Sequence, residues 1–166
     1  MSDAVRTTTV VAVDPDAAFE LFTRDVDAWW GSGPRFRFHP ERGSRLCFEP
    51  GIGGRFLEEH GDGSDPFEIG RIRVWKPPSR LVFGFRARAF APAESTEVEV
   101  RFDPHPEGCR VSVEHRGWSA FGDAHPVRHG VDADAFRDMM GVWWADLLTA
   151  ARRFAADRSE REGAAR

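Results

Sequence analysis

One long apolar stripe near the C-terminus limits the folds that this chain can adopt. From about Asp132 to Ala156, apolar side chains recur at intervals of three and four residues, while most charged ones fall outside the stripe. Its members are Phe136, Met139, Met140, Trp143, Trp144, Leu147, Leu148, Ala151 and Phe154. This spacing predicts one amphipathic helix over 132–156, with Trp143 and Trp144 mostly buried, followed by a polar, frayed tail over 157–166. Such a helix must bury its apolar face against another large element.

The residues before this helix predict that element, a set of β-strands. Residues 5–13 are rich in β-branched side chains, and residues 96–102 alternate strictly between apolar and charged ones. Strands are expected at 5–13, 45–49, 54–60, 67–75, 80–88, 96–102 and 109–115. The short turns between most of them favour an antiparallel meander. A change of parity between Ile69 and Ile72 predicts a β-bulge near Gly70.

Two short helices are expected between the first and second strands. Asp14 is a good N-cap and Pro15 suits the first helical position, so a helix should run to about Thr23, with a second over 26–30. With 166 residues, the chain has room for one domain, spanning 1–166 with a core at about 5–156. The predicted architecture is an α+β helix-grip fold. A curved antiparallel sheet of about six to seven strands wraps the C-terminal helix.

Several short segments, in this order, resemble one known superfamily. They are Phe19-x-x-Phe22-Thr23 with Trp29-Trp30, Gly53-Gly54-Arg55-Phe56, Gly70-x-Ile72, Pro77-Pro78-x-Arg80-Leu81-Val82-Phe83, Thr96-Glu97-Val98-Glu99-Val100 and Val113-x-His115-x-Gly117-Trp118. The chain resembles the START-like (SRPBCC) superfamily over about 5–156, specifically the branch named after the activator of the heat-shock-protein-90 ATPase. The resemblance implies a cavity between sheet and helix. In that superfamily the cavity binds apolar molecules, and some members are aromatases or cyclases.

Composition and charge exclude several classes of protein. The net charge of −4 argues against a nucleic-acid partner. The N-terminus lacks the basic patch and apolar run of a signal peptide, and no segment is long and apolar enough to insert into a membrane, which predicts a cytoplasmic location. The arginine-rich, lysine-poor composition is typical of a GC-rich bacterial genome.

No cofactor and no metal site are expected. Cys47 and Cys109 form neither a metal knuckle nor a disulfide framework, and both should be reduced and buried. His125 and His129 have the spacing of two ligands, but Pro126 lies between them and no acidic or thiol partner completes the set. Glu58 and Glu59, at a predicted strand end, are interpreted as solvent-facing residues.

The aromatic side chains point to a binding site instead. Fourteen Phe and six Trp in one small domain predict a bulky core or an aromatic-lined cavity. The candidate ligand-binding residues are Trp30, Phe36, Phe38, Phe83, Phe85, His115, Trp118, Met139, Met140 and Trp143. By alternation with Val111 and Val113, His115 should face inward, where it could orient a ligand, act as a general base or fill a structural role. No residue is assigned as catalytic.

These observations leave three functional hypotheses. The leading one is a pocket protein that binds or sequesters a small hydrophobic, aromatic molecule, such as a natural product, in transport or self-resistance. The second is a cavity enzyme of the aromatase/cyclase or hydrolase type that uses His115. The third is a co-chaperone-like module that binds a protein partner. The chain is expected to be a monomer or a homodimer.

Overall fold

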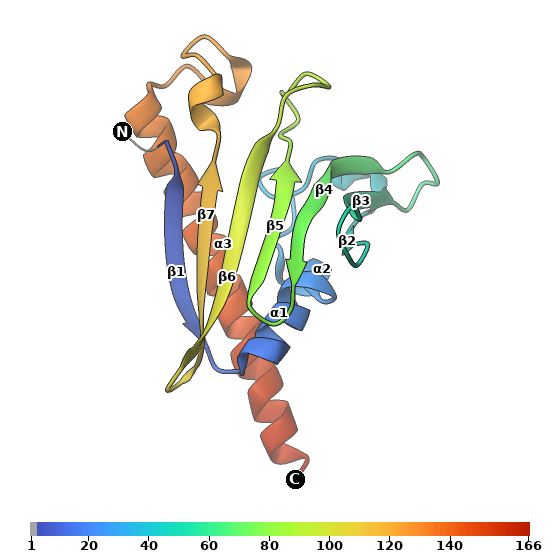
Figure 1. The fold of residues 1–166 in the computed structure, drawn as a ribbon. Helices are drawn as coiled ribbons and strands as arrows, with labels where there is room; N and C mark the ends of the chain where they lie inside the picture. The colour runs from blue at the N-terminus through green and yellow to red at the C-terminus, as the bar shows by residue number, and fades with distance from the viewer. Residues whose placement is uncertain (1–2) are drawn as a thin grey trace.

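A curved seven-stranded antiparallel sheet forms the body of the protein in the computed structural model, which describes residues 3–166 (Figure 1). The strands lie in the order β1-β7-β6-β5-β4-β3-β2. They are β1 (Val5–Val11), β2 (Ser44–Phe48), β3 (Arg55–His60), β4 (Phe67–Lys76), β5 (Arg80–Phe85), β6 (Thr96–His105) and β7 (Gly108–Arg116). From β2 to β7, each strand pairs with the next strand along the chain, which confirms the predicted meander. Strand β1 pairs with β7 and forms the other edge of the sheet.

The helices begin where their capping residues predict. Helix α1 (Pro15–Thr23) is capped by Asp14, whose carboxylate accepts a hydrogen bond from the backbone N–H of Ala17 at 2.9 Å. Asp132 caps α3 (Ala133–Ala164) in the same way. Helix α2 (Val26–Trp29) follows α1, and the described residues also form three 3₁₀ turns: η1 (Pro40–Arg42), η2 (Trp118–Ala120) and η3 (Pro126–Arg128).

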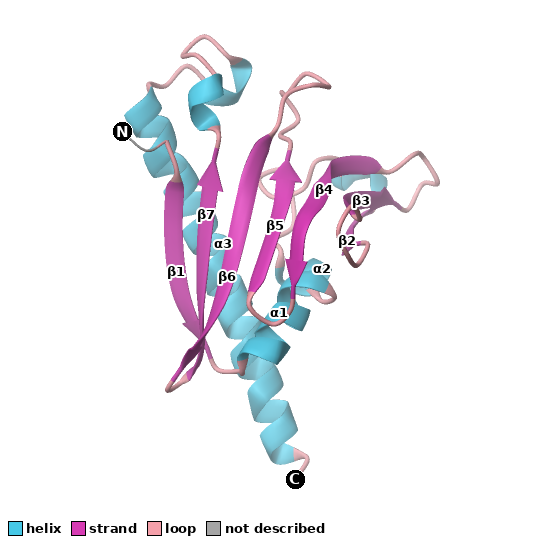
Figure 2. Ribbon diagram, in the orientation of Figure 1, coloured by secondary structure: helices cyan, strands magenta, loops and turns pink. Residues whose placement is uncertain are grey.

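Helix α3 covers one face of the sheet, with α1 and α2 at one end (Figure 2). Its side chains Trp144, Leu147, Leu148 and Ala151 are buried and form the core with the inward side chains of the strands. The helix-grip prediction is therefore confirmed. Trp144 is fully buried, and Trp143 packs against the edge of the core with part of its side chain exposed toward an opening at one end of the sheet.

The predicted bulge near Gly70 is present. The register between β3 and β4 shifts between the pairs Phe56–Gly70 and Leu57–Glu68, and a second shift between β4 and β5 lies between Ile72 and Val74. A Cβ atom at Gly70 would lie 1.6 Å from the carbonyl oxygen of Gly84, so only glycine permits this approach of the two strands.

The prediction of a frayed tail from residue 157 is wrong, because α3 continues to Ala164. The Arg158 guanidinium forms an ion pair with Asp25 at 2.7 Å, and a second contact to Glu162 follows one turn later at 3.5 Å. Ala155 is fully buried. A contact with the segment between α1 and α2 thus holds the last turns of α3, which composition alone does not reveal.

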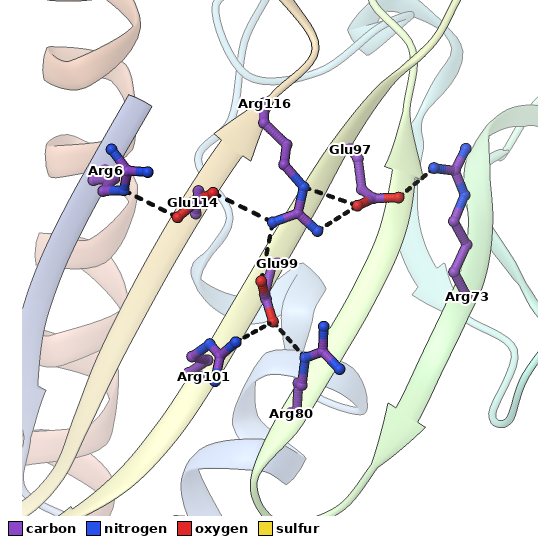
Figure 3. Close-up of polar contacts among 8 residues, drawn as sticks. All are labelled: Arg6, Arg73, Arg80, Glu97, Glu99, Arg101, Glu114 and Arg116. Atoms are coloured by element: carbon purple, nitrogen blue, oxygen red, sulfur yellow. Dashed lines mark hydrogen bonds and ion pairs between the residues drawn. The ribbon is translucent and has the colours of Figure 1, made fainter. Parts of the chain in front are cut away.

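The face of the sheet that points away from α3 carries a network of ion pairs (Figure 3). Arg116 contacts Glu97, Glu99 and Glu114. Arg73 also contacts Glu97, Arg80 and Arg101 contact Glu99, and Arg6 contacts Glu114. Because Glu99 and Glu114 stand directly opposite each other on β6 and β7, a shared arginine is needed to offset their repulsion.

Both cysteines are free thiols, but only Cys109 is buried, so the expectation for Cys47 is wrong. Cys47 lies on β2, an edge strand of the sheet, which has a neighbouring strand on one side only.

Within residues 3–166, no helix combines the length and the hydropathy required to cross a bilayer.

Candidate ligand-binding pocket

A pocket of about 450 Å³ lies where the end of β5, the loops before α3 and the first turns of α3 meet. Its volume falls within the range of small-molecule sites, about 300–1,000 Å³. The lining is formed by Pro34, Arg35, Phe36, Arg37, Phe38, Phe85, Ala87, Arg88, Ala89, Trp118, Val127, His129, Phe136, Met139, Met140 and Trp143. Six aromatic rings and two methionines give the interior an apolar, partly deformable surface.

Two anchors position the segment 34–38, which forms one wall. Arg37 donates hydrogen bonds to the carbonyl oxygens of Gly31 and Trp30 at 2.7 and 2.8 Å and to the carboxylate of Asp27 at 2.5 Å. Glu58, on β3, accepts hydrogen bonds from the backbone N–H groups of Phe38 and the next residue, both at 2.6 Å. These contacts hold the rings of this wall in a preformed arrangement.

The expectation that Glu58 faces solvent is wrong, because its side chain is fully buried. The segment that follows α2 folds over β3 and brings two backbone N–H groups onto the carboxylate, which satisfies a charge that would otherwise be costly to bury. The imidazole Nε2 of His60 lies 3.4 Å from the same carboxylate. Glu58 is a positioning residue that the sequence analysis missed, and no local pattern marks it.

The opposite walls come from β5, η2 and α3. Strand β5 ends at Phe85, earlier than predicted, and the chain then turns so that Ala87–Ala89 line the pocket. Trp118 packs edge-on against Phe136 with their ring centroids 5.0 Å apart. Trp143 stacks on Phe36, and its indole N–H donates a hydrogen bond to the carbonyl oxygen of Arg35 at 2.9 Å. The partly exposed Trp143 thus links α3 to the wall at 34–38.

The structure brings seven of the ten predicted site residues into this lining: Phe36, Phe38, Phe85, Trp118, Met139, Met140 and Trp143. Trp30 and Phe83 instead lie in the core beneath it. Trp30 donates a hydrogen bond to the carbonyl oxygen of Phe36 at 3.1 Å, and Phe83 packs edge-on against Phe56. The ligand-binding role of all ten residues remains a prediction.

His115 faces inward as predicted, is fully buried and does not line the pocket. Its Nδ1 accepts a hydrogen bond from the indole N–H of Trp144 at 3.1 Å, so its Nε2–H donates to the hydroxyl of Thr96 at 2.7 Å. The Thr96 hydroxyl in turn donates to the carbonyl oxygen of Phe85 at 3.0 Å. Burial lowers the pKa of His115 to about 3. With both ring nitrogens engaged, this neutral imidazole has no free nitrogen for a ligand or a proton transfer.

Sequence reasoning missed the polar part of the lining, namely Arg35, Arg37, Arg88 and His129. The alternation Arg35-Phe36-Arg37-Phe38 was the available signal for the first two, since it places charged and aromatic side chains together. Among residues 3–166, no group of three or more His, Cys, Asp or Glu side chains is arranged to hold a metal ion.

Comparison with known proteins identifies the family. The family model described as activator of Hsp90 ATPase homolog 1-like protein matches residues 12–140, most of the chain. The chain belongs to this family. Membership in the Hsp90-activator-like family confirms the resemblance found in the sequence and agrees with the helix-grip architecture.

Solved structures similar to this member of the Hsp90-activator-like family share its fold at low sequence identity. Protein MLL2253 from Mesorhizobium loti is 16% identical with a TM-score of 0.63, over 93% of this chain and 97% of that one. DynU16, a protein in the dynemicin biosynthetic locus, is 18% identical with a TM-score of 0.62, over 93% of this chain and 47% of its own. An anthrahydroquino-gamma-pyrone synthase, Txn09, is 28% identical with a TM-score of 0.53, over 94% and 99%. Comparison with curated proteins gave no match.

Proposed function

We propose that this protein binds a small hydrophobic molecule with fused aromatic rings in the pocket between the end of the sheet and α3. The observation that supports this most is the preformed aromatic lining: Phe36, Phe38 and Trp143 are held by hydrogen bonds and ring contacts within the protein. A rigid, aromatic-lined site requires little ordering when a flat apolar ligand enters, so little affinity is lost to entropy.

The energetics are consistent with a carrier or a sequestering protein. A ligand that buries about 300 Å² of apolar surface gains about 7 kcal/mol at the usual coefficient. Before any cost of association, this gain corresponds to a dissociation constant of about 10 μM, so after that cost the expected binding is micromolar at the tightest. Such an affinity permits both capture and release.

The similar structures support a natural product as the ligand. The name of Txn09 describes a synthase of a fused polycyclic aromatic compound, and DynU16 is assigned to a biosynthetic locus. For a protein that captures and releases such a compound, the role that we propose is transport or self-resistance. Catalysis by His115 is not part of this proposal, because both nitrogens of that ring are engaged within the core.

A neutral probe, anthracene-2-carboxamide, tests the proposal. Two tryptophans, Trp118 and Trp143, line the pocket, so binding should quench the protein's fluorescence saturably, with a dissociation constant of about 10 μM or weaker. Phe85→Ala and Trp143→Ala should weaken binding, because each removes part of the apolar lining.

A pocket-filling variant provides the sharper control. Ala89 lines the pocket, whereas Ala93 is an exposed residue of the same loop outside the lining. Ala89→Phe should weaken binding at least about tenfold, equivalent to about 1.4 kcal/mol, and Ala93→Phe should leave it unchanged. Quenching that does not saturate, or equal loss in both variants, would contradict binding in this pocket.

A further inference from the structure

The pocket has an excess of side-chain cations and donors. Arg35, Arg37, Arg88 and His129 line it, and no Asp or Glu is among the lining residues of the described chain. The whole protein has a net charge of −4, so this local excess does not reflect the overall composition. A ligand that enters the pocket therefore meets an apolar interior and a border rich in hydrogen-bond donors.

Two of these arginines are already neutralised within the protein. Arg37 is paired with Asp27, and Arg35 forms an ion pair with Asp146 of α3 at 2.7 Å. Both pairs join the wall at 34–38 to helices. Arg35 and Arg37 therefore have a structural role, because each charge is already paired with a carboxylate of the protein.

Arg88 and His129 have no such role. Both side chains are exposed, and neither forms a hydrogen bond or an ion pair with any residue of 3–166. Glu41 lies near Arg88 without pairing with it: the backbone N–H of Glu41 itself, and more weakly His39 and Arg88, lower the pKa of that carboxyl.

Arg88 and His129 come from different loops, one after β5 and one after η3, which lie at the same end of the sheet (Figure 1). The indole N–H of Trp118, another lining residue, is buried and also lacks an acceptor in the described chain. The unpaired side-chain groups of the pocket are therefore a guanidinium, an indole N–H and an imidazole, and all three can donate hydrogen bonds.

We infer that the ligand is an aromatic acid, with its rings inside the pocket and an anionic oxygen group at the mouth beside Arg88 and His129. This inference rests on the proposed function. A guanidinium matches the geometry of a carboxylate and can donate two parallel hydrogen bonds to it. Because both residues are exposed, the anion stays partly hydrated and avoids most of the desolvation cost of a buried charge.

Two probes with the same ring system test this inference. Anthracene-2-carboxylate carries a negative charge, and anthracene-2-carboxamide is its neutral counterpart of nearly equal size. Isothermal titration calorimetry should show the carboxylate binding about tenfold more tightly at low salt, and the difference should shrink as the salt concentration rises.

A matched pair of variants assigns the preference to Arg88. Arg88→Met should reduce the affinity for the carboxylate about tenfold and leave the carboxamide within about twofold, as expected for loss of one charge-assisted contact. Arg110→Met removes an exposed arginine of β7 outside the lining, and it should change neither affinity. Arg88→Glu should reverse the preference between the probes.

Failure of the inference differs from failure of the proposed function. If the carboxamide binds as tightly as the carboxylate or more tightly, the aromatic-acid inference is overturned while binding in the pocket stands. Equal loss in Arg88→Met and Arg110→Met would show a diffuse attraction and overturn the role of Arg88. If neither probe binds, the proposed function itself fails, and the inference fails with it.

Discussion

At the scale of single residues, two polar arrangements stabilise the fold in opposite environments. His115 is neutral and buried, and it joins Trp144 of α3 to Thr96 of β6. Arg116 lies on the other face of the sheet, among three glutamates. Both arrangements make stability depend on pH, but in different ranges.

The first prediction concerns His115. Its pKa is about 3 in the folded protein and 6.5 ordinarily, so between these values the unfolded chain binds a proton that the folded protein does not. The contribution of neutral His115 to the free energy of unfolding is therefore fully present above pH 6.5. Below pH 6.5 it falls by about 1.4 kcal/mol per pH unit until the pH reaches about 3. His115→Gln can keep both hydrogen bonds without titrating. Urea unfolding between about pH 7 and pH 5 should show this slope in the wild type only; a slope in both proteins would contradict the assignment.

The second prediction concerns Arg116. Burial alone would raise the pKa values of Glu97 and Glu99, but hydrogen bonds from the surrounding arginines outweigh it and hold both below the ordinary value. The stability they contribute is present above about pH 4.5 and is lost as the pH falls through the lowered values. Arg116→Met should cost about 2 kcal/mol at neutral pH.

Arg6→Met is the control for that variant, because Arg6 is well exposed and contacts only Glu114 in the network. Its cost, measured by the same urea titration, should stay below about 1 kcal/mol. Equal costs for both variants would mean that the network adds nothing beyond its separate pairs.

At the scale of elements, α3 determines both the core and the pocket. Its middle turns bury Trp144 and Leu148 against the sheet, its first turns line the pocket, and its last turns lie beside Asp25. Different parts of one helix therefore serve folding and binding.

Removal of α3 provides the third prediction. A chain that ends before Phe136 leaves the apolar face of the sheet uncovered, and its product should be insoluble or should bind hydrophobic dyes without a cooperative melting transition. A soluble truncation that unfolds cooperatively would contradict the helix-grip account of stability.

The end of α3 provides the fourth prediction. Arg158→Ala removes the partly buried ion pair with Asp25 and should lower stability by about 1 kcal/mol, with earlier fraying of residues 157–164 in amide hydrogen exchange. Arg153→Ala, at an exposed position of the same helix without an ion pair in the described chain, should change neither property.

At the scale of the whole molecule, stability and binding are separated in space. Fully buried side chains such as Trp144, Phe83 and His115 fill the space between the middle of the sheet and α3, and the pocket lies at one end. A ligand can therefore enter without disturbing the core.

The fifth prediction follows from this separation. Anthracene-2-carboxamide at about 100 times its dissociation constant should stabilise the folded protein by about 2.7 kcal/mol and raise the melting temperature by about 5–10 °C. In Ala89→Phe the shift at the same probe concentration should fall to about half or less, while the melting temperature without probe stays near that of the wild type. An equal shift in Ala89→Phe would place binding elsewhere.

The elements and their order are predictable from local signals in the chain. Asp14-Pro15 and Asp132 mark helix starts, strict alternation marks β6, and the parity change marks the bulge near Gly70, because each of these signals is local. The sequence also indicated seven of the residues that line the pocket, five of them aromatic and two of them methionines.

Long-range packing, in contrast, determines which polar groups are buried, paired or free. Glu58 is buried because the segment after α2 folds over it, Arg35 is neutralised by Asp146, and His115 is held between two elements. These partners lie about twenty to more than a hundred residues apart, and no periodic pattern encodes such pairs. The unpaired state of Arg88 depends on the same long-range packing, because a charge is free only when no distant acid reaches it.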